Sequence, residues 1–294
     1  MKKVYLLFIL SVLLLPVSAQ NRFMDGFMLR ESFQSLNDNA EPAFFTYTNP
    51  KDKSESWLLS AAIGYDILTY NARLSLTPYA GYYKNTLIDN KQNNWQTGVS
   101  LEWKALDIFE KSWTPVFIAA GKYNKDEVTK NSSFQGNIYF TPLFKGKGLS
   151  PTYFWIPNNT TNFGKVLQFS YSPYLGVENE NRIDTKDNLS SGSIYRLLFR
   201  VSSTIAFFPE DDKIRDKFGI DFDWQYRYNF AENVDNLTVS NHKFLKLGFY
   251  YTFLHLSDSK NAKISFDYVD GSDPTRGFAK QSYFAISLKV KFMP

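Results

Sequence analysis

Long stretches of this sequence alternate between apolar and polar residues at every second position. In the clearest stretch, Phe218 to Phe230, every second side chain is aromatic or isoleucine. The intervening positions hold Gly219, Asp221, Asp223, Gln225, Arg227 and Asn229. Because successive side chains of a β-strand point to opposite faces, this alternation predicts a strand with one apolar and one polar face.

Segments of this kind recur along most of the chain. They predict twelve strands, at 43–48, 56–68, 73–84, 93–105, 114–124, 133–143, 164–175, 192–207, 217–230, 242–256, 262–269 and 281–292. Several exceed the length of an ordinary strand, about five or six residues, and reach the roughly nine to eleven residues that a tilted strand needs to cross a bilayer. The sequence therefore predicts an all-β protein with membrane-crossing strands.

The apolar faces of these strands are aromatic near their ends. Examples are Trp57, Trp95, Trp224, Tyr228 and Phe230. Membrane β-barrels carry aromatic girdles at both membrane interfaces, so this placement favours a barrel. A soluble β-sandwich or propeller is the alternative, but it does not explain strands of this length with such continuous aromatic faces.

The connections between the predicted strands alternate in length. Short polar turns are followed by longer polar segments at 85–92, 124–132, 177–191, 231–241 and 270–280. Short turns on one side and long loops on the other are typical of outer-membrane barrels. One connection, 144–163, is too long for a short turn, so it either contains a further hairpin, giving fourteen strands, or folds into the lumen.

The first residues have the composition of an export signal. Lys2 and Lys3 precede an apolar run from Val4 to Leu15, and Ala19 follows as a small residue at a cleavage site. The run is too short to span a bilayer as a helix. We expect residues 1–19 to be a cleaved signal peptide, residues 20–42 an N-terminal periplasmic leader with a short helix or an irregular path, and residues 43–294 the barrel.

Composition excludes several classes of protein. Aromatic residues make up 18% of the chain, which is too many for a disordered polar chain, and no apolar run approaches the length of a transmembrane helix. The chain has no cysteine and two histidines, so we predict no cofactor and no metal. A formal net charge of only +4 argues against a nucleic-acid partner.

The signal peptide, the aromatic-rich alternation and the final strand together resemble the outer-membrane β-barrels of Gram-negative bacteria. In that class the last strand commonly ends in an aromatic residue that the barrel-assembly machinery reads. Phe292 fits this position, although Met293 and Pro294 follow it. The resemblance implies a transmembrane antiparallel up-and-down β-barrel in the cell outer membrane. Its expected partners are outer-membrane lipid, lipopolysaccharide and, during biogenesis, the assembly machinery.

The polar faces of the strands carry charges that we expect to line the lumen. These are Glu102, Lys104, Lys122, Arg196, Arg200, Asp221, Asp223, Arg227, Lys263 and Lys289. Charge on a water-filled lumen costs little compared with charge on a lipid face, and its field can screen solutes. We therefore predict a narrow porin-like channel or a protein that binds or passes small solutes. The cationic excess favours anionic or zwitterionic solutes.

Two other functions stay open. One is a non-conducting structural or docking barrel whose outer loops bind a partner. The other is a lipid-acting barrel enzyme, for which His255 with Ser257 and Asp258 is the nearest candidate, and His242 with Asp235 would suit a protease. Both groups are typical of polar turns and loops, so we predict no catalytic residue.

Overall fold

The computed structural model describes residues 25–36, 41–48, 55–68, 71–86, 91–107, 110–144, 149–184, 191–211, 213–215, 217–234, 240–272, 278 and 280–293. The predicted signal peptide, residues 1–19, lies outside the described residues. Among those described, no helix is long and apolar enough to cross a membrane. They form fourteen strands and one short 3₁₀ turn.

The strands follow one another along the chain. Their bounds are β1 (Phe27–Arg30), β2 (Ala43–Thr48), β3 (Ser56–Tyr65), β4 (Leu74–Asn85), β5 (Gln92–Lys104), β6 (Trp113–Asp126), β7 (Ser132–Phe144), β8 (Thr160–Phe163), β9 (Leu167–Asp184), β10 (Gly192–Phe207), β11 (Phe218–Glu232), β12 (Asn241–Ser257), β13 (Lys260–Ser272) and β14 (Lys280–Phe292). The 3₁₀ turn is η2 (Pro151–Tyr153).

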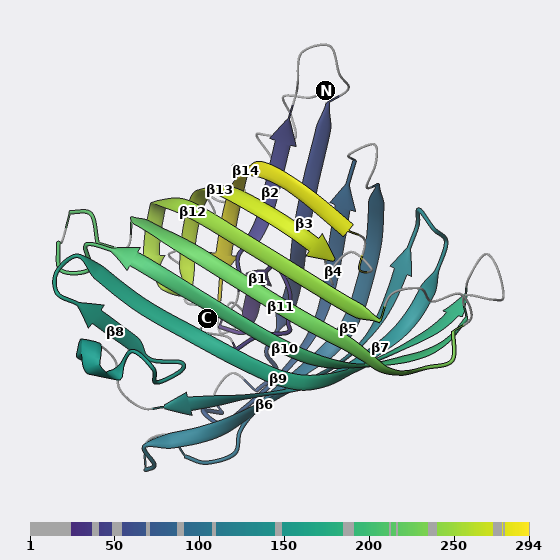
Figure 1. Ribbon diagram of the computed structural model, residues 1–294, viewed down its shortest axis with the longest axis horizontal. Coiled ribbons are helices and arrows are strands. Elements are labelled where there is room, and N and C mark those ends of the chain that lie inside the picture. Colours follow the sequence, from purple (N-terminus) through teal and green to yellow (C-terminus); the bar gives the residue numbers. More distant parts are fainter. Residues whose placement is uncertain are drawn as a thin grey trace.

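The strands close into an antiparallel barrel (Figure 1). Neighbouring strands pair in sequence order from β2 to β14, apart from β8, and β14 pairs back onto β2. This ring contains twelve of the described strands, so the predicted all-β, twelve-stranded antiparallel barrel is confirmed. The other two described strands lie outside this ring: β1 pairs with β3 and β14, and β8 pairs with β9.

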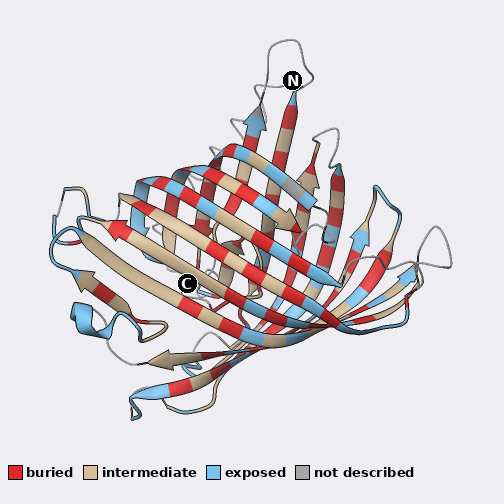
Figure 2. Ribbon diagram, in the orientation of Figure 1, coloured by how far each residue is buried: buried red, intermediate tan, exposed pale blue. Residues whose placement is uncertain are grey.

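Burial in this barrel is the reverse of burial in a soluble protein (Figure 2). On β11 the polar residues Asp223 and Arg227 are 5% and 2% exposed, whereas Tyr228 and Phe230 are 44% and 50% exposed. The polar positions of the alternating pattern therefore face the lumen, and the aromatic positions face outward.

The two ends of the barrel differ less than expected. We call the end where β1 begins and β14 finishes the terminal end, and the other the loop end. Connections at the loop end cover 86–91, 127–131, 185–191, 233–240 and 273–279, which resemble 66–73 and 105–112 at the terminal end. The prediction of long loops at one end is therefore wrong, because these connections are shorter in the structure. Strands such as β9 continue into the polar segments that were expected to be loops. Backbone hydrogen bonds to the neighbouring strands are enough to extend a strand through such sequence.

The N-terminal leader enters the barrel wall. Arg30 of β1 pairs with Ala62 on β3, and Phe44 of β2 pairs with Ser60 on the same strand. On the other side Leu29 faces Phe292 and Ala43 faces Val290. β1 and β2 thus form one strand in continuous register. The described residues between Arg30 and Ala43, which are 31–36 and 41–42, leave this strand, and we call them the inward loop.

The helix considered for the leader is therefore wrong for its described residues. Phe27 belongs to β1, whereas Phe33 and Leu36 belong to the inward loop. β1 covers backbone groups of β3 and β14 that would otherwise lie unpaired at the barrel seam. The Glu31 amide donates to the Glu41 carbonyl at 2.8 Å, which closes the neck of the inward loop.

The long connection 144–163 does contain an additional strand. β8 forms a hairpin with the first residues of β9, where β9 is no longer paired with β7. The Asn158 side chain donates to Thr141 Oγ1 of β7 at 2.8 Å, which joins this segment to the wall. Phe154 and Trp155 are 54% and 59% exposed. The segment completes the wall at the terminal end, while the inward loop occupies the lumen.

Candidate functional site

The inward loop crosses the lumen from its own strand to the far wall. Phe33 is 1% exposed and stacks on Tyr79 with ring centroids 4.8 Å apart. Leu36 is 3% exposed and packs in a cluster of inward-facing residues from four strands. That cluster contains Val116, Ile118, Tyr139, Tyr174 and Leu198. The loop therefore fills the middle of the barrel with apolar contacts.

Sequence reasoning missed this cluster, although one signal was available. On β6 the inward positions 116, 118 and 120 are as apolar as the outward positions 115, 117 and 119. A strand that is apolar on both faces predicts burial on both sides. The partner that buries the inner face of β6 is a loop from the beginning of the chain.

Hydrogen bonds between backbone groups of the loop and side chains of the wall hold the loop at several points. The Tyr83 hydroxyl donates to the Glu31 carbonyl at 2.9 Å, and the Ser100 hydroxyl donates to the Phe33 carbonyl at 3.0 Å. The Leu36 amide donates to the Tyr174 hydroxyl at 3.4 Å. These bonds come from β4, β5 and β9, so the loop is fixed to widely separated parts of the wall.

Two carboxylates of the inward loop meet cations of the wall. Lys246 Nζ lies 2.8 Å from Glu31 Oε2 and 2.8 Å from Glu41 Oε2. Arg200 contacts Glu41 Oε1 at 2.7 Å and Asp223 Oδ1 at 2.8 Å. We call these five residues the latch cluster. They connect the loop to β10, β11 and β12.

The latch cluster has three carboxyl groups and two cations. Burial, helped by the nearby Glu41 carboxylate and opposed by Lys246, raises the pKa of Glu31 to about 8. Burial also opposes ionisation of Glu41, but Lys246 and Arg200 lower its pKa overall. Of the two loop carboxyl groups, Glu31 is therefore the one that takes up a proton first as the pH falls.

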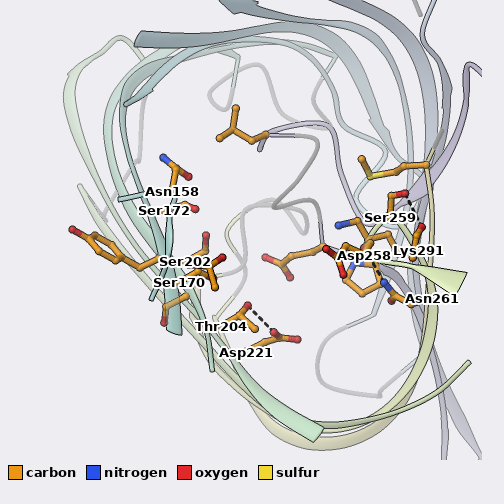
Figure 3. Close-up of a pocket in the computed structure, with 18 of the residues that line it drawn as sticks. Asn158, Ser170, Ser172, Ser202, Thr204, Asp221, Asp258, Ser259, Asn261 and Lys291 are labelled. Carbon is orange, nitrogen blue, oxygen red and sulfur yellow. Dashed lines mark hydrogen bonds between the residues drawn. The ribbon is translucent and has the colours of Figure 1, made fainter. Parts of the chain in front are cut away.

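A polar cavity of about 820 Å³ occupies the terminal half of the lumen. Figure 3 shows hydroxyl and amide side chains on one wall, among them Ser170, Ser172, Ser202 and Thr204, facing Asn261 and Lys291 on the other. Glu41 and Leu36 of the inward loop also line it. The loop is thus part of the cavity wall.

Six of the ten predicted lumen charges line this cavity, and the other four lie elsewhere in the lumen. Those that line the cavity are Glu102, Lys104, Asp221, Asp223, Lys263 and Lys289. Arg200 contacts the inward loop, and Arg196 and Arg227 lie toward the loop end. Lys122 donates to Gln96 at 3.3 Å. Their effect on solutes stays a prediction.

A second set of ion pairs, the loop-end cluster, fills the other half of the lumen. Arg227 Nε donates to both oxygens of Glu178 at 3.0 and 2.9 Å, and Arg196 Nη2 lies 2.6 Å from Glu180 Oε2. The Phe278 ring lies 4.3 Å from the Arg196 guanidinium carbon. Glu178 and Glu180 were missed because they lie in a segment interpreted as a loop, although they alternate as strand residues do.

The candidate catalytic groups are not arranged for catalysis. His255 Nε2 lies 4.0 Å from Asp258 Oδ1, and the Ser257 hydroxyl pairs with the Ser259 hydroxyl at 3.0 Å. A catalytic Ser257 would have its hydroxyl hydrogen-bonded to the His255 imidazole as its base, whereas this hydroxyl is paired with Ser259. His242 is buried beside Phe278, and Asp235 lies outside the described residues. Within the described part of the chain, no three acidic, histidine or cysteine residues are placed to hold a metal ion.

Comparison with known proteins finds structural similarity without sequence similarity. No protein-family model matches the chain, and no curated protein matches it. The transport unit of the autotransporter AIDA-I from Escherichia coli is 12% identical with a TM-score of 0.45, over 97% of this chain and 94% of that one. The NanC porin is 12% identical with a TM-score of 0.40, over 85% and 100%.

The siderophore receptor PirA from Pseudomonas aeruginosa is 11% identical with a TM-score of 0.28, over 90% of this chain and 39% of that one. At such identities the likeness concerns the course of the strands and says nothing about ligand or activity. The resemblance of this chain to outer-membrane β-barrels is one of class, and it rests on the closed antiparallel barrel and on the alternating sequence.

Proposed function

We propose that the protein is an outer-membrane β-barrel that admits small polar solutes from its terminal end and passes them when the inward loop is displaced. The reversed burial supports the membrane location. On neighbouring strands Phe266 and Ile286 are 52% and 65% exposed, whereas Asp267 and Lys289 are 3% exposed. An outer surface of this kind associates in water and is stable in lipid.

The position of the cavity supports the solute role. Both β1 and β14 place the chain ends at the terminal end, so we assign this end to the periplasm. The inward loop and the loop-end cluster lie between the cavity and the loop end. Passage therefore requires at least the loop to leave its position, and the barrel as described is the closed state.

The register of the first strand suggests a direct experiment. Because β1 and β2 pair with consecutive positions of β3 and β14, deleting residues 31–42 joins Arg30 to Ala43 without shifting the ladder. Arg30 faces inward, so Ala43 faces outward and Phe44 inward, as in a regular strand. We expect the deletion variant to form a barrel without the loop.

Conductance in a planar bilayer tests the proposal. The full chain is expected to conduct rarely, and the deletion variant is expected to show steady single-channel conductance. A heat-modifiable gel band serves as the control for correct folding. If the folded deletion variant never conducts, passage through the lumen is refuted and a docking barrel becomes the better assignment.

A further inference from the structure

The backbone ladder of the barrel wall is interrupted between β7 and β9. These strands pair as far as Phe140 and Leu175. Beyond this pair β7 continues along β6 to Phe144, and β9 continues along β10 with β8 on its other edge (Figure 1). In the part of the chain that the structure describes, no backbone ladder joins β7 to β8. We call the boundary between residues 141–144 and residues 158–163 the wall seam.

The Asn158 side chain bridges the wall seam. Its Nδ2 atom donates to Thr141 Oγ1 at 2.8 Å and to the Pro142 carbonyl, both on β7. The Asn158 backbone amide donates to the Tyr171 carbonyl of β9 at 2.7 Å. Asn158 is therefore fixed to β9 through its backbone and to β7 through its side chain. Rotation of that side chain separates it from β7 without breaking a backbone ladder.

The wall seam lies between the polar cavity and the outer surface. Leu143 on one side of the seam and Asn158 and Thr160 on the other line the cavity. On the outside, Phe140 and Leu175, the last pair of the β7–β9 ladder, are 36% and 58% exposed. The seam therefore begins at the surface that we assign to lipid. Backbone groups without a ladder partner are costly in lipid, so an interruption at this level requires an explanation.

Exposed aromatic side chains lie on the segment that leads to the seam. Tyr153, Phe154 and Trp155, in and next to η2, are 45%, 54% and 59% exposed. The Tyr171 hydroxyl donates to the Trp155 carbonyl, which holds this turn against β9. Tyrosine and tryptophan favour the membrane–water interface, where lipid headgroups lie. The outer side of the seam is therefore suited to contact headgroups of the adjacent leaflet.

The cavity wall across from the seam carries cations. Lys263 and Lys289 face each other in the register of β13 and β14, and both line the cavity. Lys289 Nζ lies 2.8 Å from Asp267 Oδ1. Lys263 Nζ lies 3.9 Å from Asp221 Oδ2, which is longer than a hydrogen bond. The Lys263 ammonium group is therefore able to donate to a further acceptor, and the Ser170 hydroxyl lines the seam side of the same cavity (Figure 3).

We propose that the wall seam is a lateral entrance through which a membrane phospholipid places its headgroup in the cavity while its acyl chains stay in the bilayer. Opening requires the Asn158 side chain to rotate away from β7. The phosphate oxygens then accept hydrogen bonds from Lys263 and from serine hydroxyls. This inference goes beyond the proposed function, because the route runs sideways through the wall and does not involve the inward loop.

Labelling of a thiol in the cavity tests the lateral entrance. The chain has no cysteine, so Ser170→Cys provides a single thiol on the cavity wall. The protein is reconstituted in phosphatidylcholine vesicles that contain phosphatidylethanolamine with a maleimide on its headgroup. The rate of lipid attachment, followed by mass spectrometry, reports entry of a headgroup. Soluble N-ethylmaleimide, in vesicles without the reactive lipid, reports access through the terminal end.

Two variants of the Ser170→Cys protein identify the route. Asn158→Gly removes the bridging side chain and tolerates the φ of 54° at this position. Because two side-chain hydrogen bonds are lost, lipid attachment is expected to accelerate about thirtyfold, at an unchanged rate with N-ethylmaleimide. Asn162→Ala is the matched control, since Asn162 accepts from Gln168 at 3.1 Å within the same hairpin and does not cross the seam. A heat-modifiable gel band verifies that each variant is folded.

A third variant tests the phosphate contact. Adding Lys263→Met to Asn158→Gly is expected to slow lipid attachment about tenfold, the typical effect of one hydrogen bond to a charged group. The rate with N-ethylmaleimide should stay the same.

Three results would overturn the lateral entrance: no lipid attachment to any folded variant, equal attachment rates with and without the Asn158 side chain, or an equal acceleration with N-ethylmaleimide, which would mean a general loosening of the barrel. An unchanged rate in the Lys263→Met variant would refute the phosphate contact. These outcomes are separable from the conductance experiment, because conductance of the deletion variant requires no lipid and lipid attachment requires no conductance.

Discussion

Lys246 is the residue whose removal tests most directly whether the latch cluster holds the inward loop. It is the shared partner of two loop carboxylates, at 2.8 Å from each, and its side chain is 11% exposed. Lys246→Met keeps the length of the side chain and removes its charge. Glu31 and Glu41 then lie buried beside each other, and Arg200 is the cation among the described residues that still contacts Glu41.

The size of the effect follows from burial. Removing one partner of a buried ion pair costs about 3–5 kcal/mol. Because Glu41 keeps Arg200 at 2.7 Å, we take the lower end of the range, about 3 kcal/mol, which corresponds to roughly a hundredfold increase in the population of the released loop. Protonation of Glu31 relieves part of this cost, so the increase is larger at pH 9 than at pH 6.

Thiol labelling measures that population. The chain has no cysteine, and Ser35 in the loop is 4% exposed, so Ser35→Cys provides a single protected thiol. When reclosing is faster than labelling, the labelling rate reports the released population. Adding Lys246→Met is expected to accelerate labelling about a hundredfold.

The control for this experiment is Lys263→Met, which removes a cavity lysine paired with Asp221 at 3.9 Å and is expected to leave the labelling rate unchanged. Adding Glu31→Gln to Lys246→Met is expected to restore part of the protection at pH 9, because it removes the ionised carboxylate that has lost Lys246. Equal labelling rates with and without Lys246, in barrels that are both folded, would refute the role of the latch cluster.

Three further predictions concern pH, the loop-end cluster and the membrane face. The pKa of Glu31 is about 8 in the docked loop and returns toward its ordinary value of 4.5 on release, so the docked state holds more protons between these values and docking weakens as pH rises from 4.5 to 8. Labelling of the Ser35→Cys thiol, normalised to an exposed thiol, should rise across this window and Glu31→Gln should abolish the rise; a flat profile in the unchanged protein would exclude this titration. Glu178→Ala leaves Arg227 buried without its carboxylate and should lower the free energy of unfolding in urea by about 3–5 kcal/mol, whereas a loss below 1 kcal/mol would mean that solvent reaches this pair. Ile286→Arg should destabilise folding into phospholipid vesicles by about 2–4 kcal/mol, and an unchanged stability would place this face outside the hydrocarbon.

Alternation along the sequence was enough to predict which side chains face the lumen. Asp221, Asp223 and Arg227 occupy alternate positions of one strand, and the direction of each follows from its neighbours alone. The same local rule fails at strand ends, because whether a polar segment continues as a strand depends on a partner strand. Glu178 and Glu180 were not predicted to face the lumen, because their segment was interpreted as a loop rather than as part of a strand.

The inward loop was beyond local reasoning altogether. β1 has four residues, and it is a strand only because β3 and β14 leave positions for it. Once residues 31–42 are excluded from the ladder, Phe33 and Leu36 are directed into the lumen, where apolar residues of β6, β7, β9 and β10 receive Leu36.

Alternation along the chain predicts the fold class and the division into an apolar outer and a polar inner face, because both depend on the two-residue period of a strand. It left the strand count at twelve, with fourteen as the alternative. Which charges meet depends instead on contacts between distant parts of the chain. Lys246 and Glu31 are separated by 215 positions along the chain, and their contact depends on the register with which the barrel closes. The state of the lumen depends on such pairings, because they hold the inward loop across it.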